Sequence, residues 1–403
     1  MLRFAFLALA LTTVASSTAA AQIEPIPAPT DIELADSMRV SLLTMMPGRE
    51  AYSLFGHSAL RIRDDASGLD RTYNFGTFDF DQPFFVARFL RGSLDYQLAT
   101  APYEWLLMDY ELQERPIIEQ TLALDAETSR ELYDLLEVNA LPENRSYRYD
   151  FFWDNCSTRL LDALDAALTR TGNAALSLPP PDNPQTFRQL LKPYTHGSPL
   201  LDAGLNLALA LPGDRVATAR EETFLPLELA AQLDRATVAG RPLVASRDTV
   251  FWLPDAGLPD RAFPWPLALA WMTFGLVALL SARAWTQRTP ARGLDRALFG
   301  LVGASGLILF LLWVATSHAV MRPNLNLLWA WPTHLFAVWG VSRPSSRWRL
   351  YFVLTAVVTG ATVLAWAVLP QQLPAVALPI ALAITLRAGV LGWGSPRQPV
   401  ETA

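Results

Sequence analysis

A series of apolar segments after Asp260 constrains this chain more than any other feature of its sequence. A helix needs about 20 predominantly apolar residues to cross a bilayer, and most of these segments approach that length. We therefore predict a membrane domain over residues 261–403. Pro332 and His334 interrupt the third segment and Pro379 interrupts the fifth, so a re-entrant or interfacial course stays open for these two. The five segments are residues 263–282, 297–315, 327–341, 350–369 and 375–386.

Arginines in alternate loops give this domain an orientation. The loop after the first segment holds Arg283, Arg288, Arg292 and Arg296, and the loop after the third holds Arg343, Arg347 and Arg349. The remaining loops contain Arg322 alone. Basic loops stay on the cytoplasmic side of a membrane. With five spans, this rule places the preceding domain outside the cytoplasm and the C-terminus inside.

The first two thirds of the chain have the signal-like start and the polar composition expected of an exported domain. Residues 1–21 resemble a secretory signal, with Arg3, an apolar run and three alanines before a cleavage point ahead of Gln22. Residues 22–260 hold 36 of the 38 acidic residues and 20 of the 32 basic ones, a net charge near −16. So acidic a domain is a poor candidate for binding nucleic acid, and we expect no nucleic-acid partner.

Within residues 22–260, strands and helices mix without regular βαβ alternation, which favours an α+β fold. Alternating or β-branched stretches predict strands, and apolar residues at helical spacing predict helices. The expected strands or extended segments are residues 38–46, 59–63, 72–75, 115–124 and 147–152. The expected helices are residues 84–90, 103–112, 126–139, 156–169 and 185–191.

Cys156 is the only cysteine in the chain, so it cannot form an internal disulfide. It falls in the first turn of the predicted helix 156–169, with Asp154 or Asn155 at the position of an N-cap. The helix dipole and free N–H groups there favour a thiolate, and the same N–H groups could receive an oxyanion. Cys156 also shares a helix face with leucines, so a buried core cysteine remains the alternative.

His57 is the candidate base for this thiol. It stands at the start of a predicted strand, and a histidine there that faces a cysteine at a helix start is the papain-type arrangement. Its position before the cysteine in the chain implies a circularly permuted version. Asn74, on the next strand, is the candidate group that orients the imidazole. The sequence shows no zinc-type spacing, glycine-rich phosphate loop or EF-hand, so we expect no metal and no cofactor.

Four stretches together resemble a known family, the Lnb-type lipoprotein N-acyltransferases. They are FGHSALRI around His57, YNFGTFDF around Asn74, YRYDFFWDNCSTR around Cys156, and SHAVMRPNLNLLWAWP in the membrane part. The resemblance implies an α+β permuted papain-like (NlpC/P60-like) periplasmic domain followed by an all-α transmembrane domain of about five helices. It also implies a location in the bacterial inner membrane, with the N-terminal domain in the periplasm.

The family resemblance implies an acyltransferase that moves a fatty acyl chain from a phospholipid to the N-terminal amine of a diacylated lipoprotein. Cys156 matches the family's nucleophile and His57 its base. The fourth stretch supplies a second polar block at the membrane surface. We assign this block, together with Asn155 beside the thiol, to substrate binding, although a loop that merely caps two helices is an alternative. The block consists of His318, Arg322, Asn324 and Asn326.

Two other functions stay open at this point. A membrane-tethered cell-wall peptidase or amidase of the NlpC/P60 type would use the same thiol and imidazole on a peptide. A non-catalytic envelope scaffold would keep Cys156 as a core residue. The adduct trapped on Cys156 distinguishes the acyltransferase from the peptidase or amidase, and the reactivity of the folded protein's thiol distinguishes the scaffold from both enzymes.

Overall fold

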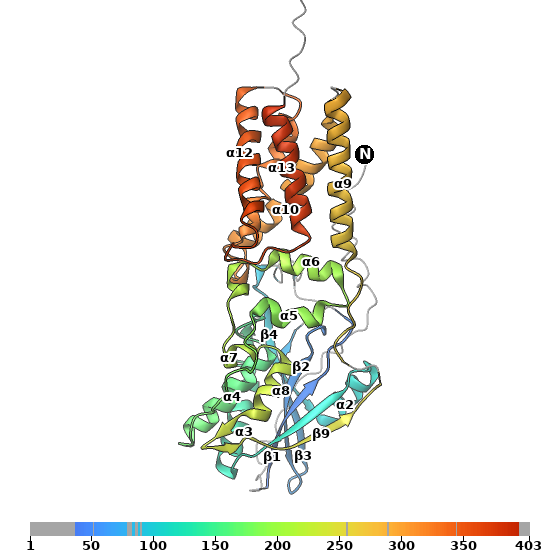
Figure 1. Ribbon diagram of the computed structural model, residues 1–403. Helices are drawn as coiled ribbons and strands as arrows, with labels where there is room; N and C mark the ends of the chain where they lie inside the picture. Colours follow the sequence, from blue (N-terminus) through green and yellow to red (C-terminus); the bar gives the residue numbers. More distant parts are fainter. Residues whose placement is uncertain are drawn as a thin grey trace, which may run out of the picture.

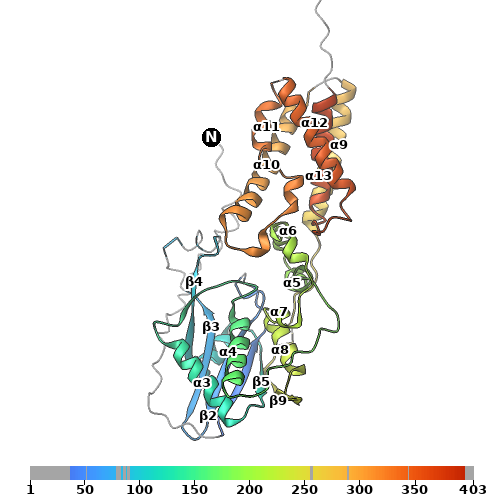
Figure 2. The ribbon, with the colours of Figure 1, turned by 90° about the vertical axis from the view of Figure 1, so that its left-hand side faces the viewer.

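The computed structural model describes residues 37–50, 52–78, 83–84, 88, 91–254, 257–287, 290–343 and 345–394 (Figure 1). The predicted signal segment and most of the helix expected at residues 84–90 lie outside this part. The described chain forms a sheet domain followed by a bundle of helices (Figure 2). The sheet domain lies within residues 22–260 and the bundle within residues 261–403.

The sheet has seven strands in the order β6-β4-β3-β2-β1-β5-β9. Every pair of neighbours is antiparallel, which agrees with the α+β expectation for this domain. The strands are β1 (Arg39–Met45), β2 (His57–Asp64), β3 (Leu69–Thr77), β4 (Asp95–Pro102), β5 (Ile117–Leu122), β6 (Ser146–Arg148) and β9 (Val244–Phe251). A separate hairpin consists of β7 (Thr237–Val238) and β8 (Arg241–Pro242).

Helices cover both faces of this sheet. Helices α3 (Ala126–Ala140), α4 (Cys156–Arg170) and α8 (Pro226–Arg235) pack on one face, in the core that contains Val40 and Leu42 of β1. Helix α2 (Tyr103–Leu112) packs on the other, with Leu43 and Met45. Because alternate side chains of a strand point to opposite faces, β1 is buried on both sides and forms the centre of the domain.

Short helices separate the sheet domain from the bundle. Helices α5 (Phe187–Thr195) and α6 (Pro199–Ala208) lie between the two parts, with α6 running across the base of the bundle (Figure 1). The segment after α6 contains η1 (Leu211–Asp214) and α7 (Ala219–Glu222). A thiol near these elements would therefore lie close to the membrane.

Among the described residues, two helices of the bundle are long and apolar enough to cross a membrane, α9 (Trp265–Gln287) and α10 (Arg292–Ala315). Helix α12 (Ser346–Leu364) begins with arginines, and α13 (Ala377–Trp393) is apolar but shorter. Helix α11 (His334–Gly340) has 7 residues, a length of about 10 Å against a hydrocarbon core of about 30 Å. The expectation of five full helical spans is therefore not confirmed.

The third predicted segment follows α10 as partly non-helical chain. After α10 come two short 3-10 turns, η2 (Ala319–Met321) and η3 (Leu325–Leu328), before α11 begins. A Cβ placed on Gly306 would lie 2.0 Å from the carbonyl oxygen of Ala330, so only glycine permits this approach. Pro332 lacks the N–H that a continuous helix requires, which accounts for the late start of α11.

A buried ion pair links three helices of the bundle. The Arg387 guanidinium of α13 donates to both carboxylate oxygens of Asp295 on α10, at 2.6 and 3.0 Å. Its third nitrogen donates to the Ser281 hydroxyl of α9 at 3.0 Å. Both charged side chains are almost fully buried. A paired charge of this kind is tolerated in an apolar bundle because each partner satisfies the other.

Candidate active site

Cys156 is the first residue of α4, and its position is set by the residue before it. The Asn155 side chain accepts hydrogen bonds from the N–H groups of Ser157 and Thr158, at 2.8 and 3.0 Å. Its amide nitrogen donates to the carbonyls of Phe151 and Phe224. Asn155 is therefore the N-cap of α4. All of its polar atoms serve the fold, and they leave none for the substrate contact that we expected.

The structure brings together the three residues predicted to be catalytic. Nε2 of His57 is hydrogen-bonded to Oδ1 of Asn74. His57 also lies close enough to Cys156 for the charge of each side chain to shift the pKa of the other. Because Asn74 occupies Nε2, the nitrogen that faces the thiol is Nδ1. The imidazole thus stands between an orienting amide and a sulfur, the arrangement that lets a histidine take a thiol proton.

Gly76 leaves a space beside this arrangement. It lies in the irregular stretch of β3 between Asn74 and Thr77 and has a φ of +92°, a conformation that favours glycine. A Cβ built on it would lie 3.5 Å from the Cβ of Cys156 and 3.7 Å from Cε1 of His57. The missing side chain leaves a methyl-sized space that is bordered by the Cβ of Cys156 and the ring of His57.

Burial and charge act in opposite directions on His57. Burial alone would lower the pKa of His57, since it disfavours the charged imidazolium. The negative charge of Cys156, its hydrogen bond and the hydrogen bond to Asn74 outweigh this effect, although the Arg115 guanidinium opposes them. The pKa of His57 is consequently raised above its ordinary value.

The thiol shows the complementary shift. Burial alone would raise the pKa of Cys156, but the charge and hydrogen bond of His57 lower it. Hydrogen bonds from the Ser58 backbone N–H and the Ser157 hydroxyl lower it further. A raised imidazole pKa and a lowered thiol pKa favour the thiolate–imidazolium pair, the reactive form of a catalytic cysteine.

Packing connects this site to the membrane domain. Leu54, just before His57, and Phe152, just before Cys156, belong to one hydrophobic cluster. The same cluster contains Val320, which lies in the loop after the membrane helix α10. Both reactive side chains are therefore held at the membrane-proximal end of the sheet domain. Cys156 itself is buried, with 8% of its surface exposed.

The second polar block does not join the site as one unit. Asn324 and Asn326 are buried and donate to the carbonyl oxygen of Leu207 at the end of α6, at 2.8 and 3.1 Å. These bonds dock the membrane domain onto α6, and sequence reasoning missed this role. His318 lies against Gly92, and Arg322 is exposed. Among the described residues, no hydrogen bond or ion pair joins the block to Cys156 or His57.

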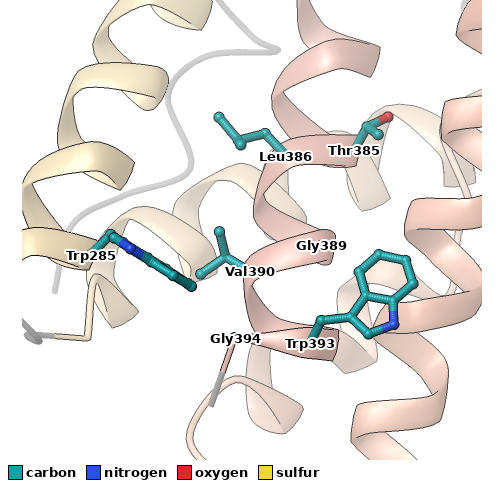
Figure 3. Close-up of a pocket in the computed structure, with 7 residues that line it drawn as sticks. All are labelled: Trp285, Thr385, Leu386, Gly389, Val390, Trp393 and Gly394. Carbon is teal, nitrogen blue, oxygen red and sulfur yellow. The ribbon is translucent and has the colours of Figure 1, made fainter. Parts of the chain in front are cut away.

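Neither of two surface hollows contains the reactive pair. One, of about 360 Å³, lies between the ends of α9 and α13 and is almost wholly apolar (Figure 3). The other, of about 370 Å³, lies beside α5. The first is lined by Trp285, Thr385, Leu386, Gly389, Val390, Trp393 and Gly394. It offers no titratable side chain for acyl or peptide chemistry.

Comparison with known families agrees with this architecture. Residues 30–193 match the Lnb N-terminal periplasmic domain, and residues 259–398 match the Lnb transmembrane domain. The chain belongs to the Lnb family. It is thus a membrane protein with a periplasmic-type N-terminal domain, in a family associated with lipoprotein maturation. No curated protein and no solved structure matches the chain.

Proposed function

We propose that this Lnb chain is a cysteine-dependent acyltransferase that moves a fatty acyl chain from a phospholipid to the N-terminal amine of a lipoprotein. The observation that carries the proposal is the position of His57, which is hydrogen-bonded to Asn74 and lies within electrostatic reach of Cys156, beside a loop of the membrane domain. The arrangement resembles the cysteine, histidine and asparagine of papain-type enzymes, as a permuted papain-like fold would provide.

The first half of the reaction forms a thioester. The Cys156 thiolate attacks the carbonyl carbon of a phospholipid ester, and the carbonyl oxygen becomes an oxyanion. When the tetrahedral intermediate collapses, the bond between that carbon and the glycerol oxygen breaks. The proton on His57 passes to the departing alkoxide, which leaves as a lysophospholipid. Asn74 holds the imidazole in the orientation that this transfer requires.

The second half forms an amide. The neutral α-amine of the lipoprotein's lipidated cysteine attacks the thioester carbon, and its proton passes to His57. Collapse of this intermediate breaks the bond between carbon and sulfur and restores the Cys156 thiolate. Neither step requires a cofactor, and the described residues contain no cluster of three or more side chains that could hold a metal.

The membrane domain gives this chemistry its setting. Both the donor ester and the lipidated acceptor lie at the bilayer surface, so a thiol packed against a membrane loop is within reach of both. We place the chain in the bacterial inner membrane with its thiol domain in the periplasm and its C-terminus in the cytoplasm. The arginine-rich loops are the basis for this orientation. His318 and Arg322 remain the members of the second block that are available to a headgroup.

The test is complementation of a bacterial strain that lacks lipoprotein N-acylation, read out by mass spectrometry of an extracted lipoprotein. We expect the wild-type chain to restore the third acyl chain and Cys156→Ala to restore none while still inserting into the membrane. Full activity of Cys156→Ala would refute the assignment of the nucleophile.

Mass spectrometry of the trapped enzyme separates this function from the peptidase alternative. Incubation with phospholipid vesicles should add the mass of one fatty acyl group to the Cys156 peptide. The Cys156→Ser variant is the matched control, because an oxygen ester on serine would survive hydroxylamine treatment at neutral pH whereas a thioester would not. A peptide adduct in place of the acyl group would favour a cell-wall substrate.

A further inference from the structure

Tyr147 on β6 carries a buried hydroxyl with no partner. The residue is 8% exposed, and its hydroxyl makes no hydrogen bond with any residue that the structure describes. Leaving a buried hydroxyl unpaired is unfavourable, so such groups are rare in folded proteins and usually have a purpose. A phenylalanine would fill the same space without that cost, which suggests that the hydroxyl serves a function.

The hydroxyl borders the space that Gly76 leaves open. A Cβ built on Gly76 would lie 4.0 Å from the Tyr147 oxygen, beside its contacts with Cys156 and His57. Burial raises the pKa of Tyr147, and the charge of Cys156 raises it further, which places the phenol within electrostatic reach of the thiolate. The tyrosine, the nucleophile and the base therefore surround one small space.

The ring of Tyr147 is held in place by its neighbours. The Arg159 guanidinium lies 3.6 Å from the ring centroid, and Phe75 meets the ring edge to face at 6.1 Å. Arg159 is fixed in turn by two hydrogen bonds to Asp154, at 2.5 and 2.9 Å. A cation over the ring draws electron density from the phenol, and so makes its O–H group a stronger hydrogen-bond donor.

The start of α4 offers a second donor at the same place. Asn155 occupies the N–H groups of Ser157 and Thr158, so those groups are not available to an oxyanion. The N–H of Cys156 itself has no hydrogen-bond partner within the described part of the chain. This N–H belongs to the residue that carries the nucleophile, so it lies next to any carbonyl that the thiolate attacks.

We propose that the Tyr147 hydroxyl and the Cys156 backbone N–H form the oxyanion hole of this site. The inference rests on the proposed function. When the thiolate attacks an acyl carbonyl in the space beside Gly76, the carbonyl oxygen acquires the negative charge and accepts hydrogen bonds from these two donors. The tyrosine keeps its proton throughout, and collapse of the intermediate restores the carbonyl. The acyl group thus supplies the partner that the hydroxyl lacks.

The test is Tyr147→Phe in the full-length protein, with two measurements. The first is the single-turnover rate of acyl transfer to Cys156 from phospholipid vesicles. It should fall by about 100- to 1,000-fold, the usual effect of removing one oxyanion donor. The second is the rate of Cys156 alkylation by iodoacetamide. It should change less than about threefold, because displacement of iodide develops no oxyanion. The melting temperature should hold or rise, because the variant loses an unpaired buried hydroxyl.

Tyr96→Phe is the matched control, since Tyr96 faces Tyr147 across β4 and β6 and is buried without electrostatic coupling to Cys156. It should leave both rates unchanged. An acyl-transfer rate for Tyr147→Phe within about threefold of wild type would overturn the oxyanion role. An equal loss of alkylation would overturn it too, by showing that the tyrosine supports the thiolate. Activity that survives Cys156→Ala would instead refute the proposed function, whatever Tyr147→Phe does.

Discussion

Replacing Gly76 by alanine tests whether the substrate carbonyl enters the space between Cys156 and His57. The added methyl would lie 3.5 Å from the Cβ of Cys156 and 3.7 Å from Cε1 of His57, which are ordinary contact distances. It would therefore fill the space without pushing the two reactive groups apart. We expect acyl transfer to be lost, because no carbonyl carbon could then approach the sulfur from this side.

The free energy of unfolding of Gly76→Ala should fall by an amount that depends on the backbone conformation at residue 76. Gly76 has a φ of +92°, and an L-residue in the left-handed region costs about 1–2 kcal/mol. For a domain of this size, about 1 kcal/mol corresponds to a shift of roughly 2–4 °C in melting temperature. The expected decrease is thus a few degrees, too small to abolish activity through unfolding.

Gly68→Ala is the matched control for this strain. Gly68 has a φ of +75°, and a Cβ built on it would meet nothing within 4 Å. Both variants should therefore melt a few degrees below wild type, and only Gly76→Ala should lose acyl transfer. The assay is the rate of Cys156 acylation from vesicles, measured beside a thermal melt in the same detergent. Wild-type acylation by Gly76→Ala would show that the carbonyl binds elsewhere.

Two further outcomes follow from charges in the structure. Because the pKa of Cys156 is lowered and that of His57 is raised, kcat/KM should follow a bell-shaped pH profile. The midpoint of the acid limb, set by the thiol, should lie below the ordinary thiol pKa of about 8.5, and the midpoint of the alkaline limb, set by the imidazole, should lie above its ordinary pKa of about 6.5. An acid midpoint at the ordinary thiol pKa would contradict the ion pair. Arg387→Met leaves Asp295 buried without its partner and should destabilise the bundle by about 3–5 kcal/mol, whereas the double variant with Asp295→Leu should recover most of that loss in a thermal melt. Equal melting of the single and double variants would contradict this reasoning.

Sequence patterns predicted three helices of the sheet domain closely, whereas α6, α7 and α8 were not predicted. Helices α2, α3 and α4 begin at Tyr103, Ala126 and Cys156, the residues at which we expected them to start. Their apolar positions recur at helical spacing, which is a local property of the sequence. Strands β4 and β9 were not predicted. Strand β9 pairs at a sheet edge and is mostly exposed, so it lacks the buried alternating pattern that identifies a strand.

The reactive residues were predictable because each is chemically distinctive. Cys156 is the single thiol, and His57 is one of few histidines, at the start of a recognisable strand. Tyr147 was not predictable in this way, since the chain has 10 tyrosines and only a three-dimensional structure reveals which hydroxyl lacks a partner. Asn324 and Asn326 present the opposite case, because we assigned them to substrate binding from the sequence and the structure places them in contacts within the fold. Their amides bind backbone carbonyls of α6, and no local pattern indicates that the chain would fold α6 against them.

The docking role of these asparagines explains how a membrane domain could control a thiol outside the membrane. Asn324 and Asn326 fix the loop after α10 to the end of α6, and Val320 of the same loop enters the cluster that contains Phe152. Phe152 lies four residues before Cys156 in the chain, so the position of the thiol relative to the bilayer depends on these contacts. These contacts would serve the proposed transfer between two lipid-anchored substrates, because neither substrate could leave the membrane to meet the enzyme.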